Sequence, residues 1–150
     1  MNDPTDIRGW QRFDARTTTS GKLLEGDVAR LAGIGVGHVI NLAPDDGPEA
    51  LPGESEKLAA SGIGYSYIPV PFDAPTDQHF EAFRAELAMI GDTSLHVHCI
   101  ANYRVSAFYY RLNRDHRGIP EPEARALMHQ QWAPEKSDDP RAKVWADFIK

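Results

Sequence analysis

Short apolar segments that alternate with stretches of helical spacing constrain the fold of this chain most strongly. The apolar segments cover residues 38–42, 64–70 and 95–98. Apolar side chains recur every three or four positions over residues 24–31, 80–90 and 105–112. Strands that alternate with helices form parallel neighbours joined by right-handed crossovers. The sequence therefore predicts an α/β fold in one domain, residues 1–150, with a central, mostly parallel sheet flanked by helices.

The remaining segments fit this architecture. Residues 52–60 and 120–128 are typical of helices, and residues 144–149 predict a closing helix that covers the core. Thr76 is a suitable N-cap for the helix that contains residues 80–90. Residues 17–20 read Thr-Thr-Thr-Ser, and for this polar run we expect an edge strand or a loop.

A parallel sheet also predicts where a ligand binds. Ligands in such sheets lie beyond the carboxyl ends of the strands. The loops after Leu42, Val70 and His98 should therefore share one edge of the sheet. This places Asp73 near Cys99.

Cys99 is the only cysteine in the chain, and it follows an apolar strand at the start of a helix. The amides that open a helix attract anions. Thiols in that position have their pKa lowered from about 8.5 toward roughly 4 to 7, which yields a nucleophilic thiolate. The segment thus predicts an anion-binding thiolate site, and the alternative is a buried, inert cysteine. A lone cysteine forms no internal disulfide, in agreement with a reducing cytoplasm.

The residues around Cys99 resemble the signature loop of the cysteine-dependent protein tyrosine phosphatase superfamily, which reads His-Cys, five residues, Arg, then Ser or Thr. His98 and Cys99 match, but Arg104 follows after four residues. Without a gap, Asn102 takes the place of the usual glycine, Ser106 matches, and Val105 replaces the arginine. With a one-residue deletion in the loop, Arg104 aligns with the arginine of the signature, and Ser106 falls one position after its Ser or Thr. We prefer the ungapped register, because Asn readily adopts a left-handed turn.

The form His-Cys-x-Ala-Asn-x-Arg-x-Ser is similar to a bacterial branch of dual-specificity-phosphatase-like proteins with the same arginine spacing. One helical residue corresponds to about 100° of rotation. We therefore expect Arg104 to need a loop conformation, outside regular helix, to reach a bound anion.

Attack of a thiolate on a phosphate monoester needs donors for the phosphate oxygens, a cation and a proton for the leaving group. Arg104 is the candidate cation and Asp73 the candidate acid, with Asp45 and Asp46 as substitutes. The alternative for Asp73 is a plain turn residue. The candidate donors are the backbone amides of Ile100, Ala101, Asn102, Tyr103, Arg104 and Val105.

The resemblance implies the same mechanism. Its members carry the acid on a loop some tens of residues before the cysteine, and Asp73 lies in such a loop. Asp73 would then activate the water that hydrolyses the cysteinyl phosphate, and Ser106 would help the sulfur leave. The alternative for Ser106 is a hydrogen bond to its own helix. His98 would orient the loop and favour the thiolate, and Asn102 would hold the loop in place.

Three other interpretations remain at this point. Rhodanese-like sulfurtransferases use a shorter cysteine loop and would form a persulfide on Cys99. A non-catalytic module would bind phosphate without turnover. A zinc site would use His96 and His98, which share a strand face, but it needs a further ligand and leaves Arg104 unexplained.

Composition narrows the partners. A net charge of −6 argues against general binding of nucleic acid or acidic membranes. No run of apolar residues is long enough for a membrane span, and the N-terminus lacks the pattern of a secretory signal. We expect a cytoplasmic protein without a cofactor or metal, acting on a phosphorylated protein or a small phosphate ester.

Overall fold

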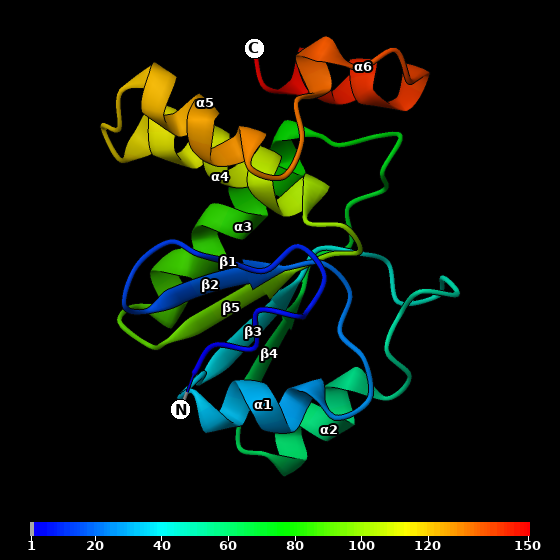
Figure 1. Cartoon of the computed structure of the whole chain (residues 1–150), viewed down its shortest axis with the longest axis vertical. Helices are drawn as coiled ribbons and strands as arrows, with labels where there is room; N and C mark the ends of the chain where they lie inside the picture. Colours follow the sequence, from blue (N-terminus) through cyan, green and yellow to red (C-terminus); the bar gives the residue numbers. More distant parts are fainter. Residues whose placement is uncertain (1) are drawn as a thin grey trace.

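A computed structural model describes residues 2–150 and shows a five-stranded sheet between two layers of helices (Figure 1). The strands are β1 (Gln11–Arg12), β2 (Thr17–Ser20), β3 (His38–Asn41), β4 (Gly64–Tyr67) and β5 (Leu95–His98). They lie in the order β1-β2-β5-β3-β4, with β1 antiparallel to β2 and every other pair parallel. The predicted α/β fold with a mostly parallel sheet is confirmed.

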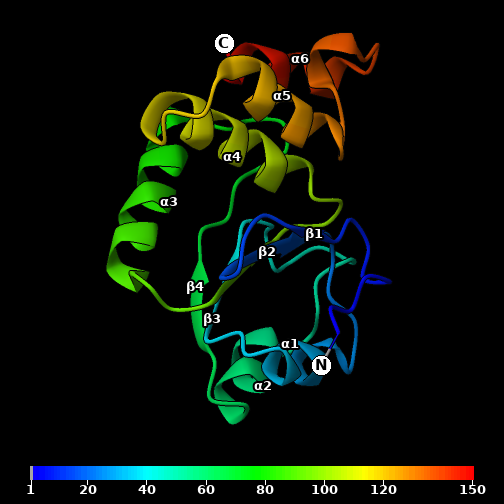
Figure 2. The ribbon, with the colours of Figure 1, turned by 60° about the vertical axis from the view of Figure 1, so that its left-hand side comes forward.

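The helices divide between the two faces of the sheet (Figures 1 and 2). One face carries α1 (Asp27–Gly33) and α2 (Glu54–Ala60). The other face carries α3 (Asp77–Ile90), α4 (Tyr103–His116), α5 (Glu121–His129), the short 3-10 helix η1 (Pro134–Lys136) and α6 (Pro140–Phe148). Thr76 caps α3 as predicted, since its hydroxyl accepts from the His79 amide at 3.2 Å. Within residues 2–150, none of these helices has the length and apolar character needed to cross a bilayer.

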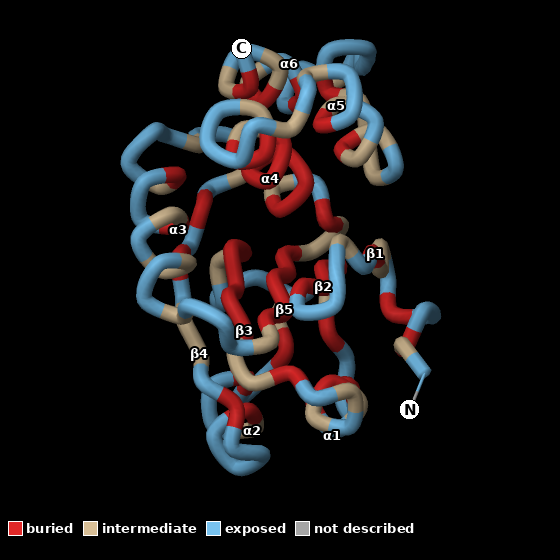
Figure 3. The backbone as a smooth tube through the Cα atoms, turned by 90° about the vertical axis from the view of Figure 1, so that its left-hand side faces the viewer, coloured by how far each residue is buried: buried red, intermediate tan, exposed pale blue. Residues whose placement is uncertain are grey.

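Each face of the sheet has its own apolar core, and Figure 3 shows β2, β5 and most of β3 buried between them. Successive strand residues point to opposite faces. Ile40 accordingly packs with Phe83 and Phe108 under α3 and α4, while its neighbour Val39 packs with Leu58 under α2. Burial on both faces explains why the β3 segment carries the adjacent apolar residues Val39 and Ile40.

We expected an edge strand or a loop at residues 17–20, and this expectation was wrong because these residues form an internal strand. β2 lies inside the sheet between β1 and β5, and all four of its residues are buried. Its polar side chains have partners: Thr18 Oγ1 lies 2.8 Å from His96 Nδ1, and Ser20 Oγ lies 2.8 Å from His96 Nε2. Burial lowers the pKa of His96 well below its ordinary value, so the ring is neutral and has one donor and one acceptor.

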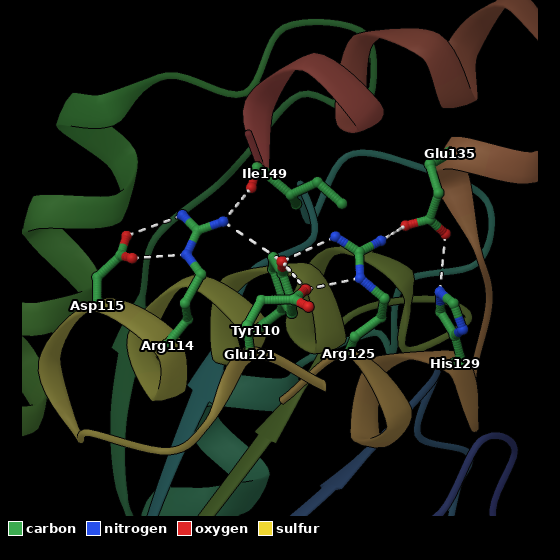
Figure 4. A network of polar contacts seen from close by, with 8 residues as sticks. All are labelled: Tyr110, Arg114, Asp115, Glu121, Arg125, His129, Glu135 and Ile149. Atoms are coloured by element: carbon green, nitrogen blue, oxygen red, sulfur yellow. Dashed lines mark hydrogen bonds and ion pairs between the residues drawn. The ribbon is translucent and has the colours of Figure 1, made fainter. Parts of the chain in front are cut away.

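A polar network holds the last three helical segments together (Figure 4). Tyr110 on α4 and Arg125 on α5 both hydrogen-bond to Glu121 Oε2, each at 2.6 Å. Arg114 donates to the carbonyl of Ile149, just after α6, at 2.6 Å. These contacts fix α5 and α6 against α4, and thereby fix the segment that connects α5 with α6.

Trp145 ties α6 to the loop after β4. The indole is fully buried, and its Nε1 donates to the carbonyl of Phe72 at 2.7 Å. The Phe72 and Trp145 rings also pack with centroids 5.7 Å apart. The loop after β4 is therefore held by the C-terminal helix, far from it in sequence.

We expect Trp145→Phe to lower the free energy of unfolding by about 1–3 kcal/mol, because the Phe72 carbonyl loses its donor. Urea denaturation measures the change. Trp132→Phe is the matched control, since the buried Trp132 Nε1 has no acceptor within residues 2–150. An equal loss in both variants would contradict the role of the Phe72 hydrogen bond.

Candidate active site

The loop from β5 to α4 leaves the middle of the sheet and is anchored on the β2 side. The Cys99 amide donates to Ser20 O at 3.3 Å, and the Lys22 amide donates to Ile100 O at 2.8 Å. Gly21 lies against this loop so closely that a Cβ on it would stand 2.5 Å from the Ile100 carbonyl oxygen. The chain after β2 therefore fits tightly against the cysteine loop.

Asn102 turns the chain from the loop into α4. With φ 66° and ψ 14° it is the one non-glycine residue with positive φ within residues 2–150, which confirms the predicted left-handed turn. Its side chain donates to Gly9 O at 2.7 Å and to Thr19 Oγ1 at 3.0 Å. The first regular bond of α4 then runs from the Ser106 amide to Asn102 O at 3.0 Å.

The turn leaves a cluster of backbone donors without partners. Within residues 2–150, none of the amides of residues 100–105 donates to a protein acceptor. A helix N-terminus ordinarily leaves its first amides unpaired, and here the preceding loop adds further ones. These are the six amides that the sequence predicts as donors, and they are available to an anion.

Cys99 directly follows β5 and is almost fully buried, with 1% of its surface exposed. It lines a cavity of about 470 Å³ together with Ile100, Ala101 and Arg104. Phe72, Tyr103 and Trp132 form an aromatic wall of the same cavity. The rings of Tyr103 and Trp132 lie parallel with centroids 4.4 Å apart.

Arg104 lies in this cavity although it is the second residue of α4. The expectation that it must leave regular helix was therefore wrong. Side chains of a helix tilt toward its N-terminus, so a long side chain in the first turn points back to the preceding loop. Arg104 lines the cavity beside Cys99, and its guanidinium carbon lies 5.2 Å from the Phe72 ring centroid.

The Arg104 side chain also retains binding capacity. Its Nε is buried and has no hydrogen-bond partner within residues 2–150. Burial lowers the pKa of Arg104 from its usual value, and the neighbouring Cys99 opposes this. Because an arginine has so high an ordinary pKa, the side chain remains a cation. A buried donor without a partner favours a bound anion.

His98 connects Cys99 to a residue that the sequence analysis missed. His98 Nδ1 lies 3.2 Å from Cys99 O, and Nε2 lies 2.6 Å from Glu54 Oε2. Glu54 is the first residue of α2 and is buried. Its position in the loop region after β3 was readable from the sequence, but its pairing with His98 was not.

Ser106 is buried, and its hydroxyl donates to Tyr103 O at 3.2 Å. This is the alternative arrangement considered for Ser106, a hydrogen bond within its own helix. Val105 is fully buried in the core under α4, so its amide and not its side chain faces the loop cluster.

The candidate acids differ in their placement. Asp73 is exposed in the turn after β4; its neighbour Phe72 lines the Cys99 cavity, whereas Asp73 does not. Asp46 lines an adjoining hollow with Ile100 and Arg104. Asp45 accepts a hydrogen bond from Tyr67 Oη at 3.1 Å.

Asp139 lines the Cys99 cavity and was not considered in the sequence analysis. It is the N-cap of α6, where it accepts from the Arg141 amide at 2.9 Å. Hydrogen bonds from the Arg141 side chain lower the pKa of Asp139 below its ordinary value. Only the fold brings this C-terminal residue next to the cysteine loop.

The two histidines of the zinc alternative do share a strand face, with ring centroids 6.3 Å apart. However, both nitrogens of His96 contact Thr18 and Ser20, and those of His98 contact Glu54 and the Cys99 carbonyl. Residues 2–150 contain no group of three or more His, Cys, Asp or Glu side chains arranged to hold a metal ion.

Comparison with known proteins gives matches in structure. No protein-family model and no curated protein matches the sequence. A crystal structure named "Putative phosphatase (DUF442)" from Shewanella putrefaciens CN-32 is 30% identical, with a TM-score of 0.81 over 98% of this chain and 94% of that one.

Two more distant structures share the fold. TpbA from P. aeruginosa is 16% identical, with a TM-score of 0.72 over 100% of this chain and 86% of that one. The catalytic domain of SIW14 from S. cerevisiae is 11% identical, with a TM-score of 0.74 over 95% of this chain and 85% of that one. At these identities the likeness shows the fold alone.

We expect Asn102→Ala to destabilise the protein more than Asn102→Gly, by about 1 kcal/mol, because alanine is strained at positive φ. Both variants lose the hydrogen bonds to Gly9 and Thr19, so their difference isolates the backbone conformation. Chemical denaturation of the two variants measures it. Equal stability would show that the left-handed turn imposes no requirement on residue 102.

Proposed function

This chain belongs to the family of the Shewanella DUF442 protein, within the cysteine-dependent protein tyrosine phosphatase superfamily, and on that premise we propose that it hydrolyses phosphate monoesters. One observation supports this most: Cys99, Arg104 and residues 100, 101 and 103 line one cavity, at a loop whose amides 100–105 have no acceptor within residues 2–150. A thiolate nucleophile, a cation and a ring of donors are what phosphoryl transfer requires.

In the first step the Cys99 sulfur attacks phosphorus while the bond from phosphorus to the ester oxygen breaks. The amides of residues 100–105 and Arg104 stabilise the charge on the three equatorial oxygens. A carboxylic acid donates its proton to the departing oxygen, so that the product leaves as an alcohol or phenol. The sulfur now carries the phosphoryl group.

In the second step water attacks the cysteinyl phosphate. The same carboxylate accepts a proton from this water, the bond from sulfur to phosphorus breaks, and the thiolate is regenerated. In this proposal Ser106 assists the departing sulfur only after its hydroxyl turns away from the Tyr103 carbonyl. The products are inorganic phosphate and the dephosphorylated substrate.

Asp73 remains our proposed acid. It follows Phe72 directly, and Phe72 contacts both the Cys99 cavity and the Arg104 guanidinium. Asp46 and Asp139 already border the site and are the substitutes.

The aromatic wall bears on the substrate. TpbA was crystallised with phosphotyrosine, and SIW14 is named a PP-IP phosphatase. In this chain the stacked Tyr103 and Trp132 rings and Phe72 offer flat apolar surface beside Cys99. We propose phosphorylated proteins or small phosphate esters as substrates, with aryl esters preferred.

We expect Cys99→Ser to abolish hydrolysis of p-nitrophenyl phosphate and Arg104→Ala to reduce kcat/KM by about 10²–10³-fold, since each removes a group that stabilises the transition state. Release of inorganic phosphate measures both. Arg84→Ala is the control, because Arg84 pairs with Glu81 on the exposed side of α3. Persulfide formation from thiosulfate without phosphatase activity would favour the sulfurtransferase. Phosphopeptide binding without turnover would favour the binding module.

We expect Asp73→Asn to slow phenyl phosphate by about 10²-fold and p-nitrophenyl phosphate far less, because a poor leaving group needs the proton more. Asp46→Asn and Asp139→Asn are assayed beside it with both esters. Equal slowing of the two esters in Asp73→Asn would remove Asp73 as the acid, and the variant with the unequal effect would identify its replacement.

A further inference from the structure

Glu54 is a buried carboxylate next to the active-site loop. Its side chain is 7% exposed and that of His98 is 5% exposed. Charged side chains are almost never fully buried unless they are paired, because desolvation is expensive. The 2.6 Å contact between Glu54 Oε2 and His98 Nε2 supplies the pair and has the length of a charge-assisted hydrogen bond.

The contacts of His98 define where its protons lie. A carbonyl oxygen only accepts hydrogen bonds, so the 3.2 Å contact with Cys99 O requires a hydrogen on His98 Nδ1. The contact between Nε2 and the Glu54 carboxylate requires a second proton between them. If that proton lies on Nε2, His98 is a cation and Glu54 its counter-ion; if it lies on the carboxyl group, both residues are neutral.

We propose that Glu54 is a positioning residue for the nucleophile: its carboxylate holds His98 with a hydrogen on both ring nitrogens, so that Nδ1 fixes the Cys99 carbonyl and a positive ring lies beside the peptide that carries the sulfur. The fixed carbonyl orients the peptide that carries the sulfur. The positive ring favours the thiolate over the thiol. Only the consequence for catalysis rests on the proposed phosphatase function.

None of the other titratable groups described around this pair supplies a negative charge that could replace Glu54 as the counter-ion of His98. His96, stacked on His98, is kept neutral because burial lowers its pKa. Burial raises the pKa of Tyr65 to about 12, so this phenol on β4 is neutral as well. Lys22 and Glu49 border the same hollow as an ion pair, and their charges compensate each other.

Arg104 stands near the sulfur and also favours the thiolate. It is unchanged in a Glu54 variant, so any effect of such a variant comes through His98.

The test removes the negative charge of residue 54 and keeps the shape of its side chain. In Glu54→Gln the amide still hydrogen-bonds to His98 but no longer stabilises a positive ring. We expect the iodoacetamide alkylation rate of Cys99 to become half-maximal at higher pH, with the rate at pH 6 reduced about threefold to tenfold. Because Cys99 is the only cysteine, alkylation reports on this thiol alone. kcat should fall by a similar factor with KM nearly unchanged.

Glu56→Gln is the matched control, since Glu56 lies in the same helix and is exposed. An alkylation profile of Glu54→Gln that coincides with those of the parent and of Glu56→Gln would overturn the proposal. A second measurement is made on the parent protein: ¹⁵N NMR of its imidazoles, with His98 assigned by its loss in His98→Gln. A hydrogen on both His98 nitrogens at pH 7 supports the proposal, and a single neutral tautomer overturns it.

The two proposals fail separately. If the parent hydrolyses no phosphate ester but its alkylation profile depends on Glu54, the phosphatase function fails and the role of Glu54 stands. If hydrolysis proceeds and Glu54→Gln changes neither the alkylation profile nor kcat, only the role of Glu54 fails.

Discussion

The left-handed turn at Asn102 is the constraint on which the site depends. β5 is held on both sides by parallel neighbours, so Cys99 emerges at a fixed point of the sheet edge. The chain must then start α4 within four residues, and the reversal directs the amides of residues 100–105 away from protein acceptors. Unpaired buried amides are costly. A fold that leaves six consecutive amides without acceptors within residues 2–150 is adapted to a ligand or water that accepts from them.

Arg104 comes one residue earlier than the arginine of the superfamily signature, but its side chain still lies in the Cys99 cavity because α4 starts at Tyr103. An arginine in the first helical turn points back over the preceding loop, and its length makes up for one residue of register. Phe72 then supports the guanidinium from the loop after β4, and Trp145 holds the Phe72 carbonyl from α6. The C-terminal helix thus takes part in the geometry of a site whose chemical groups lie after β5.

Local patterns were sufficient for the α-helices, for β3, β4 and β5, and for the turn at Asn102. Helical spacing located α3 and α4, and the tolerance of asparagine for positive φ located the Asn102 turn. Features that depend on long-range pairing were not readable. The polar β2 is internal because His96 satisfies its hydroxyls, and Glu54 is buried because His98 faces it. Each of these partners is distant in sequence, so neither propensity nor periodicity contains it.

Proximity and proton chemistry point to different acids. Asp139 borders the Cys99 cavity, which favours it geometrically. A general acid must hold a proton at the working pH, however, and Arg141 lowers the pKa of Asp139, which keeps the carboxylate ionised. Its N-cap bond to α6 further commits its oxygens. Asp139 is therefore better suited to hold Arg141 near the Phe72 ring, 5.7 Å away, than to protonate a leaving group. The proton must come from a carboxyl group without such an ion pair, and Asp73 in the turn after β4 and Asp46 in the loop after β3 both meet that requirement.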